Sequence, residues 1–176
     1  MLGAAGALCC LAAGAALGGW LRERRRARFS MLRAEMEMLG GMRLLLEQEK
    51  PAIPELLSLC ATYASEKAGA EIVARRLMLV SEVIVTEPLL GLSQAYARAC
   101  AQIPAPWEQE EEKAAMETLF LQLGSGTAAM REQAAAACLR RIRPLVLSAQ
   151  HEAETGGRLC MQLGVLLGLM AGIALW

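Results

Sequence analysis

The chain ends with Arg158-Leu-Cys-Met-Gln-Leu-Gly-Val-Leu-Leu-Gly-Leu-Met-Ala-Gly-Ile-Ala-Leu-Trp176. None of the 18 residues after Arg158 carries a charge. A helix of that length rises about 27 Å at roughly 1.5 Å per residue, which is close to the hydrocarbon thickness of a bilayer. Trp176 suits the membrane–water interface, where an amphipathic ring is favoured. We therefore predict a transmembrane helix over residues 159–176, and the rest of the fold follows from it.

A second uncharged segment covers residues 2–21 and ends in a basic flank. It has no basic residues before its apolar run, and the arginines that follow would resist translocation, so a cleaved signal peptide is disfavoured. We predict an uncleaved transmembrane helix over residues 1–21. The flank contains five arginines: Arg22, Arg24, Arg25, Arg26 and Arg28.

Both apolar segments carry glycines four residues apart. Such spacing places them on one helix face, where another helix backbone can approach closely. Glycine is also common in membrane helices without such a role, so both interpretations stay open. The candidate packing residues are Gly14, Gly18, Gly164, Gly168 and Gly172.

Every charged side chain lies between Arg22 and Arg158. Arginines at both boundaries place the domain of residues 22–158 on the cytoplasmic side of the cell membrane by the positive-inside rule. The 18 basic and 18 acidic residues give zero net charge, which argues against nucleic acid as the main partner. The six cysteines include no CxxC pair, and the scattered ones are typical of small buried side chains in a reducing compartment.

The middle domain has the periodicity of helices. A stripe from Phe29 to Leu46 continues the first membrane helix, with Gly40-Gly41 as a candidate hinge, and should stop before Pro51. Further signals predict helices in the middle domain. One helix begins at Pro54 and another covers residues 70–86. Ser93 and Thr127 are expected to cap two more, and an acidic first turn after Trp107 starts a fifth. Pro144 should kink the last of these, and residues 83–86 could alternatively form a strand. We predict an all-α fold, an antiparallel helical bundle flanked by the two membrane helices.

Catalytic patterns are weak. Gly91-Leu-Ser93-Gln-Ala95 departs from a nucleophile elbow, and the chain has no Asp to complete a triad. Gly124-Ser-Gly126-Thr127 lacks the lysine of a phosphate loop and is expected to be a turn between helices. His151, Glu152 and Glu154 do not share one helix face, so no metal site is predicted. We predict no catalytic, cofactor-binding or metal-binding residues, and a protein that is not an enzyme.

Four motifs carry a family resemblance. They are Pro54-Glu-Leu-Leu57, Gly91-Leu-Ser93-Gln-Ala95-Tyr96, Leu121-Gln-Leu123-Gly124 and Leu163-Gly164-Val-Leu-Leu-Gly168-Leu. In this order they resemble the stage III sporulation protein AB family, a small relative of the type II secretion F-domain (platform protein) family. The resemblance implies an F-domain-like bundle in a membrane component of the sporulation channel complex that links mother cell and forespore. It also implies a cytoplasmic secretion-type ATPase, stage III sporulation protein AA, as partner.

The expected function is therefore assembly and coupling. The bundle would dock the ATPase and other membrane components, the two spans would contact the lipid bilayer, and self-association is left open. Candidate docking residues are Tyr96, Trp107, Arg140, Arg141 and Arg143, although the two aromatic residues could instead be core and the arginines could meet anionic lipid headgroups. Rival interpretations are a two-span scaffold unrelated to sporulation and a subunit of a membrane enzyme or transporter.

Overall fold

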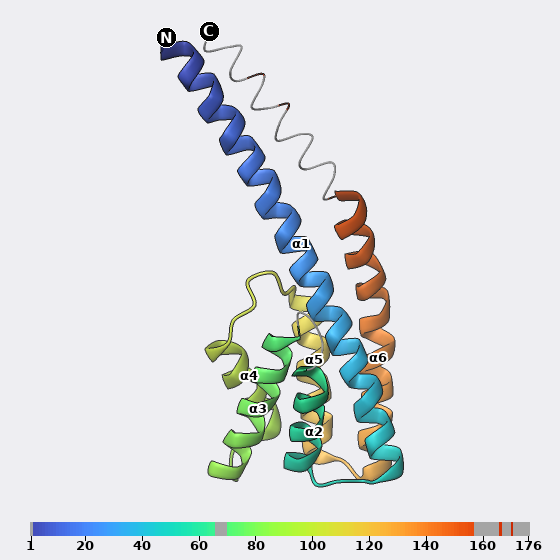
Figure 1. The fold of residues 1–176 in the computed structure, drawn as a ribbon. Coiled ribbons are helices and arrows are strands. Elements are labelled where there is room, and N and C mark those ends of the chain that lie inside the picture. Colours follow the sequence, from blue (N-terminus) through green and yellow to red (C-terminus); the bar gives the residue numbers. More distant parts are fainter. Residues whose placement is uncertain (1, 66–69, 157–165, 167–169, 171–176) are drawn as a thin grey trace. The chain divides into compact units, whose positions relative to one another are not determined.

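The computed structural model describes residues 2–65, 70–156, 166 and 170, with side chains from residue 12 onward. In this part the chain forms six α-helices, a short π-helix and no strand (Figure 1). The all-α prediction is confirmed, and the strand alternative for residues 83–86 is wrong because they lie in α3. The elements are α1 (Leu2–Gln48), α2 (Ile53–Ser65), α3 (Glu71–Thr86), α4 (Leu92–Gln102), α5 (Glu110–Ser125), α6 (Ala128–His151) and η1 (Glu152–Gly156).

The chain divides into two compact units. The terminal unit contains Met1–Phe29 and Leu147–Trp176, and the central unit contains Ser30–Val146. Since α1 and α6 cross these boundaries, each of the two helices contributes to both units.

Helix α1 is one uninterrupted element of 47 residues. It runs through Gly40-Gly41 without a break, and it ends two residues after its predicted stripe, before Pro51. Lys50 has a φ of 50°, a conformation that leaves the helix and turns the chain. The predicted continuation of the first segment into the middle domain is therefore confirmed for the backbone.

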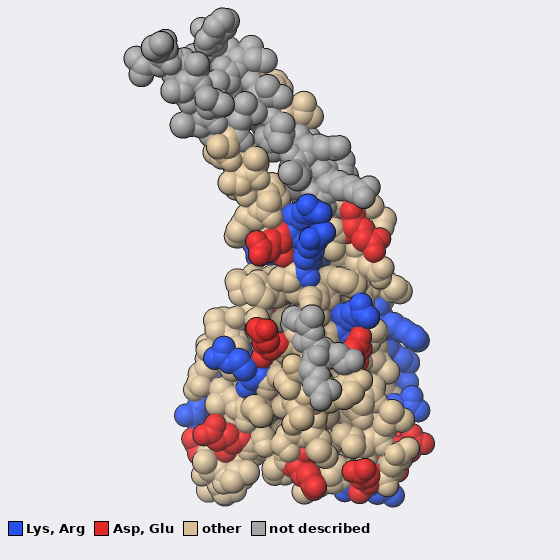
Figure 2. Space-filling model, viewed as in Figure 1, with Lys and Arg blue, Asp and Glu red and all other residues tan. Residues whose placement is uncertain are grey.

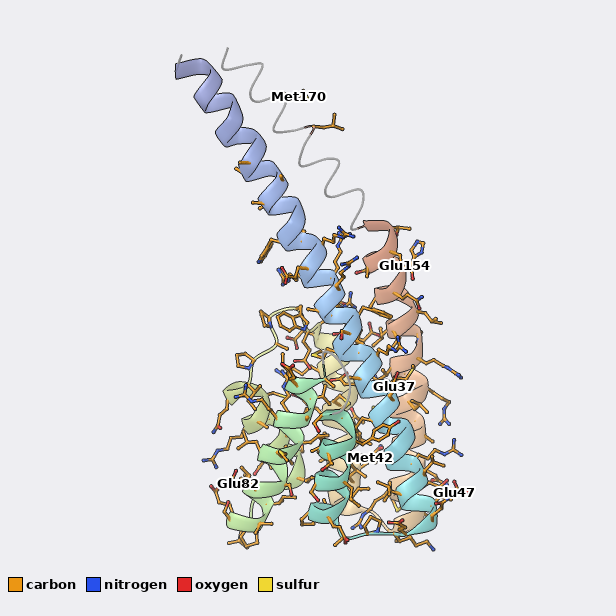
Figure 3. All side chains as sticks on the ribbon, viewed as in Figure 1. Glu37, Met42, Glu47, Glu82, Glu154 and Met170 are labelled. Atoms are coloured by element: carbon orange, nitrogen blue, oxygen red, sulfur yellow. The ribbon has the colours of Figure 1, made fainter. Side chains whose placement is uncertain are left out.

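The core of the central unit is built from the apolar stripes of its helices. Consecutive helices α2 to α5 pack on one another and alternate in direction (Figure 1). Met42 of α1 is fully buried, whereas Glu47 and Glu82 are exposed (Figure 3). Each fully buried Leu, Met or Phe side chain contributes roughly 1.5–3 kcal/mol through the hydrophobic effect. The largest buried apolar side chains include Met31, Leu32, Leu39, Leu56, Leu57, Leu77, Met116, Leu119 and Phe120.

The helix starts only partly follow the sequence expectations. Thr127 does cap α6, because its Oγ1 accepts a hydrogen bond from the Met130 amide at 3.4 Å. The acidic start of α5 is also confirmed, with the Gln109 amide donating to Glu112 Oε2 at 3.0 Å. Ser93 was wrongly predicted as a cap. Gly91 holds that position, with extended backbone and no side-chain cap.

No helix among the described residues is long and apolar enough to cross a membrane. The predicted span 159–176 lies outside the described residues except for Leu166 and Met170, and the side chains of residues 1–11 in the predicted span 1–21 also lie outside them. The flanking membrane helices therefore remain a prediction.

Candidate functional site

Three exposed arginines on α6 form the most prominent charged feature of the central unit. Arg140, Arg141 and Arg143 are all exposed. None of them makes an ion pair or hydrogen bond with another described residue. Figure 2 shows basic side chains gathered along the edge of the central unit that α6 forms. We call these three residues the basic face.

The basic face has no acidic neighbours along its own helix. From Gln133 to His151, α6 contains no Glu, and Glu132 is its one acidic residue. Elsewhere in the central unit several arginines are paired: Arg33 with Glu37 at 3.0 Å and Arg98 with Glu87 at 2.7 Å. The basic face consequently leaves three positive charges available to a ligand or partner.

The two aromatic docking candidates, Tyr96 and Trp107, differ in how deeply they are buried. Tyr96 is only 2% exposed and stacks on Phe120, with ring centroids 4.1 Å apart and an interplanar angle of 11°. Its ring is therefore part of the core of the central unit. Trp107 is half-buried, and its buried Nε1 has no hydrogen-bond partner among the described residues.

A buried polar cluster, which the sequence patterns did not reveal, joins α1, α3 and the segment just before α5. Arg76 is 2% exposed and forms a bidentate pair with Glu108, with Nη1–Oε1 and Nη2–Oε2 distances of 2.9 and 2.8 Å. Arg76 Nε also donates to the Ile103 carbonyl at 3.0 Å. Burial opposes the charge of Arg76, but its hydrogen bonds to Glu108, together with Coulombic attraction to Cys100, Glu108 and Tyr96, outweigh this and raise its pKa.

Glu35 completes this cluster from α1. Burial and then the carboxylate of Glu108 raise the pKa of Glu35 to about 8; Arg76 opposes this, and Glu112 adds the smallest contribution to the rise. Its Oε2 is buried and has no hydrogen-bond partner among the described residues. Glu35 is therefore protonated at neutral pH. Its position could have revealed it, because it follows Leu32 by three residues and precedes Leu39 by four on the buried stripe.

The predicted glycine faces are only partly visible. In α1, Gly14 is half-buried and Gly18 is buried. Gly164, Gly168 and Gly172 lie outside the described residues. Packing through these glycines remains a prediction.

In the terminal unit, an ion pair links α1 to η1, which come from the N-terminal and C-terminal parts of the chain. Arg28 Nη1 pairs with Glu152 Oε2 of η1 at 3.0 Å, and the Arg28 side chain is 7% exposed. The Arg24 guanidinium lies 5.5 Å from the ring centroid of Trp20, a cation–π distance.

The remaining sequence candidates have structural roles. Helix α5 continues through Gly124 and Ser125, and Gly126-Thr127 connects it to α6, so the predicted turn between helices is confirmed but begins two residues later. Cys60, Cys100 and Cys138 are free and buried, which confirms their expected core placement. Among the residues that the structure describes, no three His, Cys, Asp or Glu side chains are grouped so as to hold a metal ion.

Comparison with protein families identifies a match over nearly the whole chain. The family model for stage III sporulation protein AB matches residues 3–176, nearly the whole chain, and confirms the resemblance predicted from the motifs. No curated protein and no solved structure matches.

Proposed function

Because this chain belongs to the stage III sporulation protein AB family, we propose that it is a non-enzymatic membrane component of the sporulation channel complex between mother cell and forespore. Its central unit docks a cytoplasmic secretion-type ATPase, stage III sporulation protein AA, and its apolar ends hold that unit at the membrane. Family membership supports the link to sporulation, and the coupling role is our extension of it.

The observation that carries the coupling role is the continuity of α1. This one helix contains the uncharged sequence of residues 2–21 and also supplies core residues of the central unit such as Met31, Leu39 and Met42. A continuous helix is held along its length by hydrogen bonds between successive turns and resists bending. The backbone continuity of α1 supports the proposed coupling, in which a partner bound to the central unit acts on the apolar segment of the same helix.

The chemistry at the boundary of that segment fits a membrane surface. Trp20 with Arg24, and the neighbouring Arg25 and Arg26, match the aromatic and basic residues that favour the level of anionic headgroups. Two apolar ends on one chain then make the protein a two-span component of the membrane. The central unit lies on the arginine-rich, cytoplasmic side.

Sporulation counts test the cellular role. Deleting the gene in its spore-forming host should reduce heat-resistant spores by orders of magnitude, and the wild-type gene supplied elsewhere should restore them. Normal spore counts in the deletion strain would contradict the proposal.

Cysteine labelling tests the topology. In a Gln133→Cys variant, the new thiol on exposed α6 should resist a membrane-impermeant maleimide in intact cells and react after the cells are opened. The native Cys60, Cys100 and Cys138 are buried and give a low background. If the thiol is labelled in intact cells, the central unit lies outside the cytoplasm and the proposed topology is contradicted.

Co-purification tests the partner. The detergent-solubilised chain should retain stage III sporulation protein AA, and Arg140/Arg141/Arg143→Glu should release it. The control is Arg43→Glu/Arg75→Glu, which reverses two exposed arginines on α1 and α3. Failure of the wild-type chain to retain the ATPase would remove the coupling role.

A further inference from the structure

A groove of about 550 Å³ opens beside the basic face. Gln122 and Ser125, near the end of α5, line one side of it, and α6 lines the other from Met130 to Arg140. We call it the α5–α6 groove. All of its lining residues belong to the central unit.

The lining of this groove suits a helix backbone more than a bulky ligand. Ala134, Ala136 and Ala137 supply small side chains along α6, and small residues let two helices approach closely. Met130 lies at the same groove and is 57% exposed, which leaves an apolar side chain without cover. Met side chains adapt to irregular partner surfaces.

The charge beside the groove selects the partner. Arg140 lines it, and Arg141 and Arg143 follow within one turn, with no compensating carboxylate on this part of α6. Arginine binds carboxylates through two parallel hydrogen bonds, and a helix presents carboxylates three or four residues apart along one face. The spacing of Arg140 and Arg143 matches such a row.

We propose that the α5–α6 groove binds a helix of a partner protein, with small side chains of that helix against the alanines and a row of its carboxylates paired with the basic face. The amides of Gln122 and Gln133 at the groove can bond polar groups of the same helix. They make the lining too polar for an acyl chain, so a protein segment fits better than a lipid. The biological meaning of this site rests on the proposed docking function.

The test uses the full chain in a phosphatidylcholine nanodisc. The probe is a fluorescent 18-residue alanine-based helical peptide with Glu at every third or fourth position, and binding is followed by anisotropy. We expect saturable binding that weakens about tenfold with Arg140→Glu/Arg143→Glu, a loss of about 1.4 kcal/mol. Ala137→Leu, which fills the groove without changing charge, should weaken it by a similar factor.

Matched controls make the result specific to the groove. Arg43→Glu/Arg75→Glu makes the same charge change elsewhere on the central unit and should leave the dissociation constant within about twofold. A peptide with Lys in place of Glu should not bind. Absent binding of the acidic peptide, or equal weakening by both double variants, would overturn the proposal.

The same experiment distinguishes two alternative ligands of the groove, a lipid headgroup and a second copy of this chain. Displacement of the peptide by phosphatidylglycerol vesicles, but not by phosphatidylcholine vesicles, would make the face a headgroup surface and overturn the proposal. Self-association of the nanodisc-held chain that Arg140→Glu/Arg143→Glu abolishes would make the occupant a second copy, with the same consequence. The proposed cellular role and the groove site can fail separately. If the peptide binds but the deletion strain sporulates normally, only the cellular role is contradicted.

Discussion

At the scale of single residues, Glu35 makes stability depend on pH. Its folded-state pKa of about 8 lies above the ordinary 4.5, so the folded chain holds a proton that the unfolded chain has lost. The free energy of unfolding should therefore fall by about 1.4 kcal/mol per pH unit as pH rises between these values. Glu35→Gln should flatten this slope in urea titrations of the solubilised chain between pH 5 and 8.5. An unchanged slope would contradict a protonated Glu35.

The Arg76–Glu108 pair should behave as a buried unit. Arg76→Met leaves the Glu108 carboxylate, 7% exposed, without its cation, and should cost about 3–5 kcal/mol in the free energy of unfolding. Adding Glu108→Leu removes the stranded charge and should recover much of the loss. The exposed pair of Arg98 and Glu87 is the control, since Arg98→Met should cost less than about 1 kcal/mol. Equal losses for the two arginine variants would contradict this assignment.

Residue roles were the least predictable from sequence. Exposed Arg140 and buried Tyr96 both sit on helices, and only the packing of other helices decides which side chain meets solvent. Glu35 escaped detection because a charged residue on an apolar stripe is ordinarily assigned to the solvated side. The charged groups that act on its pKa, Glu108 and Arg76, are far away in the sequence.

At the scale of elements, two glycines give opposite predictions. At Gly40, inside α1, an added Cβ meets nothing within 4 Å, so Gly40→Ala should raise the free energy of unfolding by about 0.5–1 kcal/mol. At Gly126, after α5, a Cβ would lie 2.9 Å from Met130 Cβ and 3.1 Å from the Gln122 carbonyl oxygen. Gly126→Ala should therefore destabilise the chain. Thermal unfolding of both variants checks this, and a shift of the same sign in both would contradict it.

Element boundaries followed the sequence where local chemistry sets them. Helix α1 stops before Pro51, as predicted, and Thr127 caps the start of α6 because its side chain acts on adjacent backbone. Ser93 failed as a cap because Gly91, two residues earlier, takes the extended conformation that starts α4. Gly and Ser are both favoured at such a start, so the sequence alone does not choose between them.

At the scale of the whole molecule, cysteine reactivity should report the opening of the central unit. Burial raises the pKa of Cys60 and of Cys138 to about 12. Cys60 lies in α2 and Cys138 in α6, so the two thiols are on different helices of the central unit. Alkylation by iodoacetamide at pH 8 should be slow at both sites and accelerate together at the urea midpoint, as read by mass spectrometry. Fast labelling of either site without denaturant would contradict a single cooperative unit.

The architecture was more predictable than the residues. The stripe of α1 and the proline and glycine breaks predicted an all-α bundle, because helix periodicity and chain breaks are local signals. The boundaries between the terminal and central units, after Phe29 and after Val146, were not predicted, since they depend on which parts of α1 and α6 meet other helices.

The contact between Arg28 and Glu152 joins residues 124 positions apart. A ribosome adds roughly 5–20 residues per second, so about 6–25 seconds pass between the synthesis of Arg28 and that of Glu152. During that interval the first helix has left the ribosome, but the segment that contains Glu152 has not yet been synthesised. Newborn chains of this protein should therefore depend on chaperones or the insertion machinery until translation is almost complete.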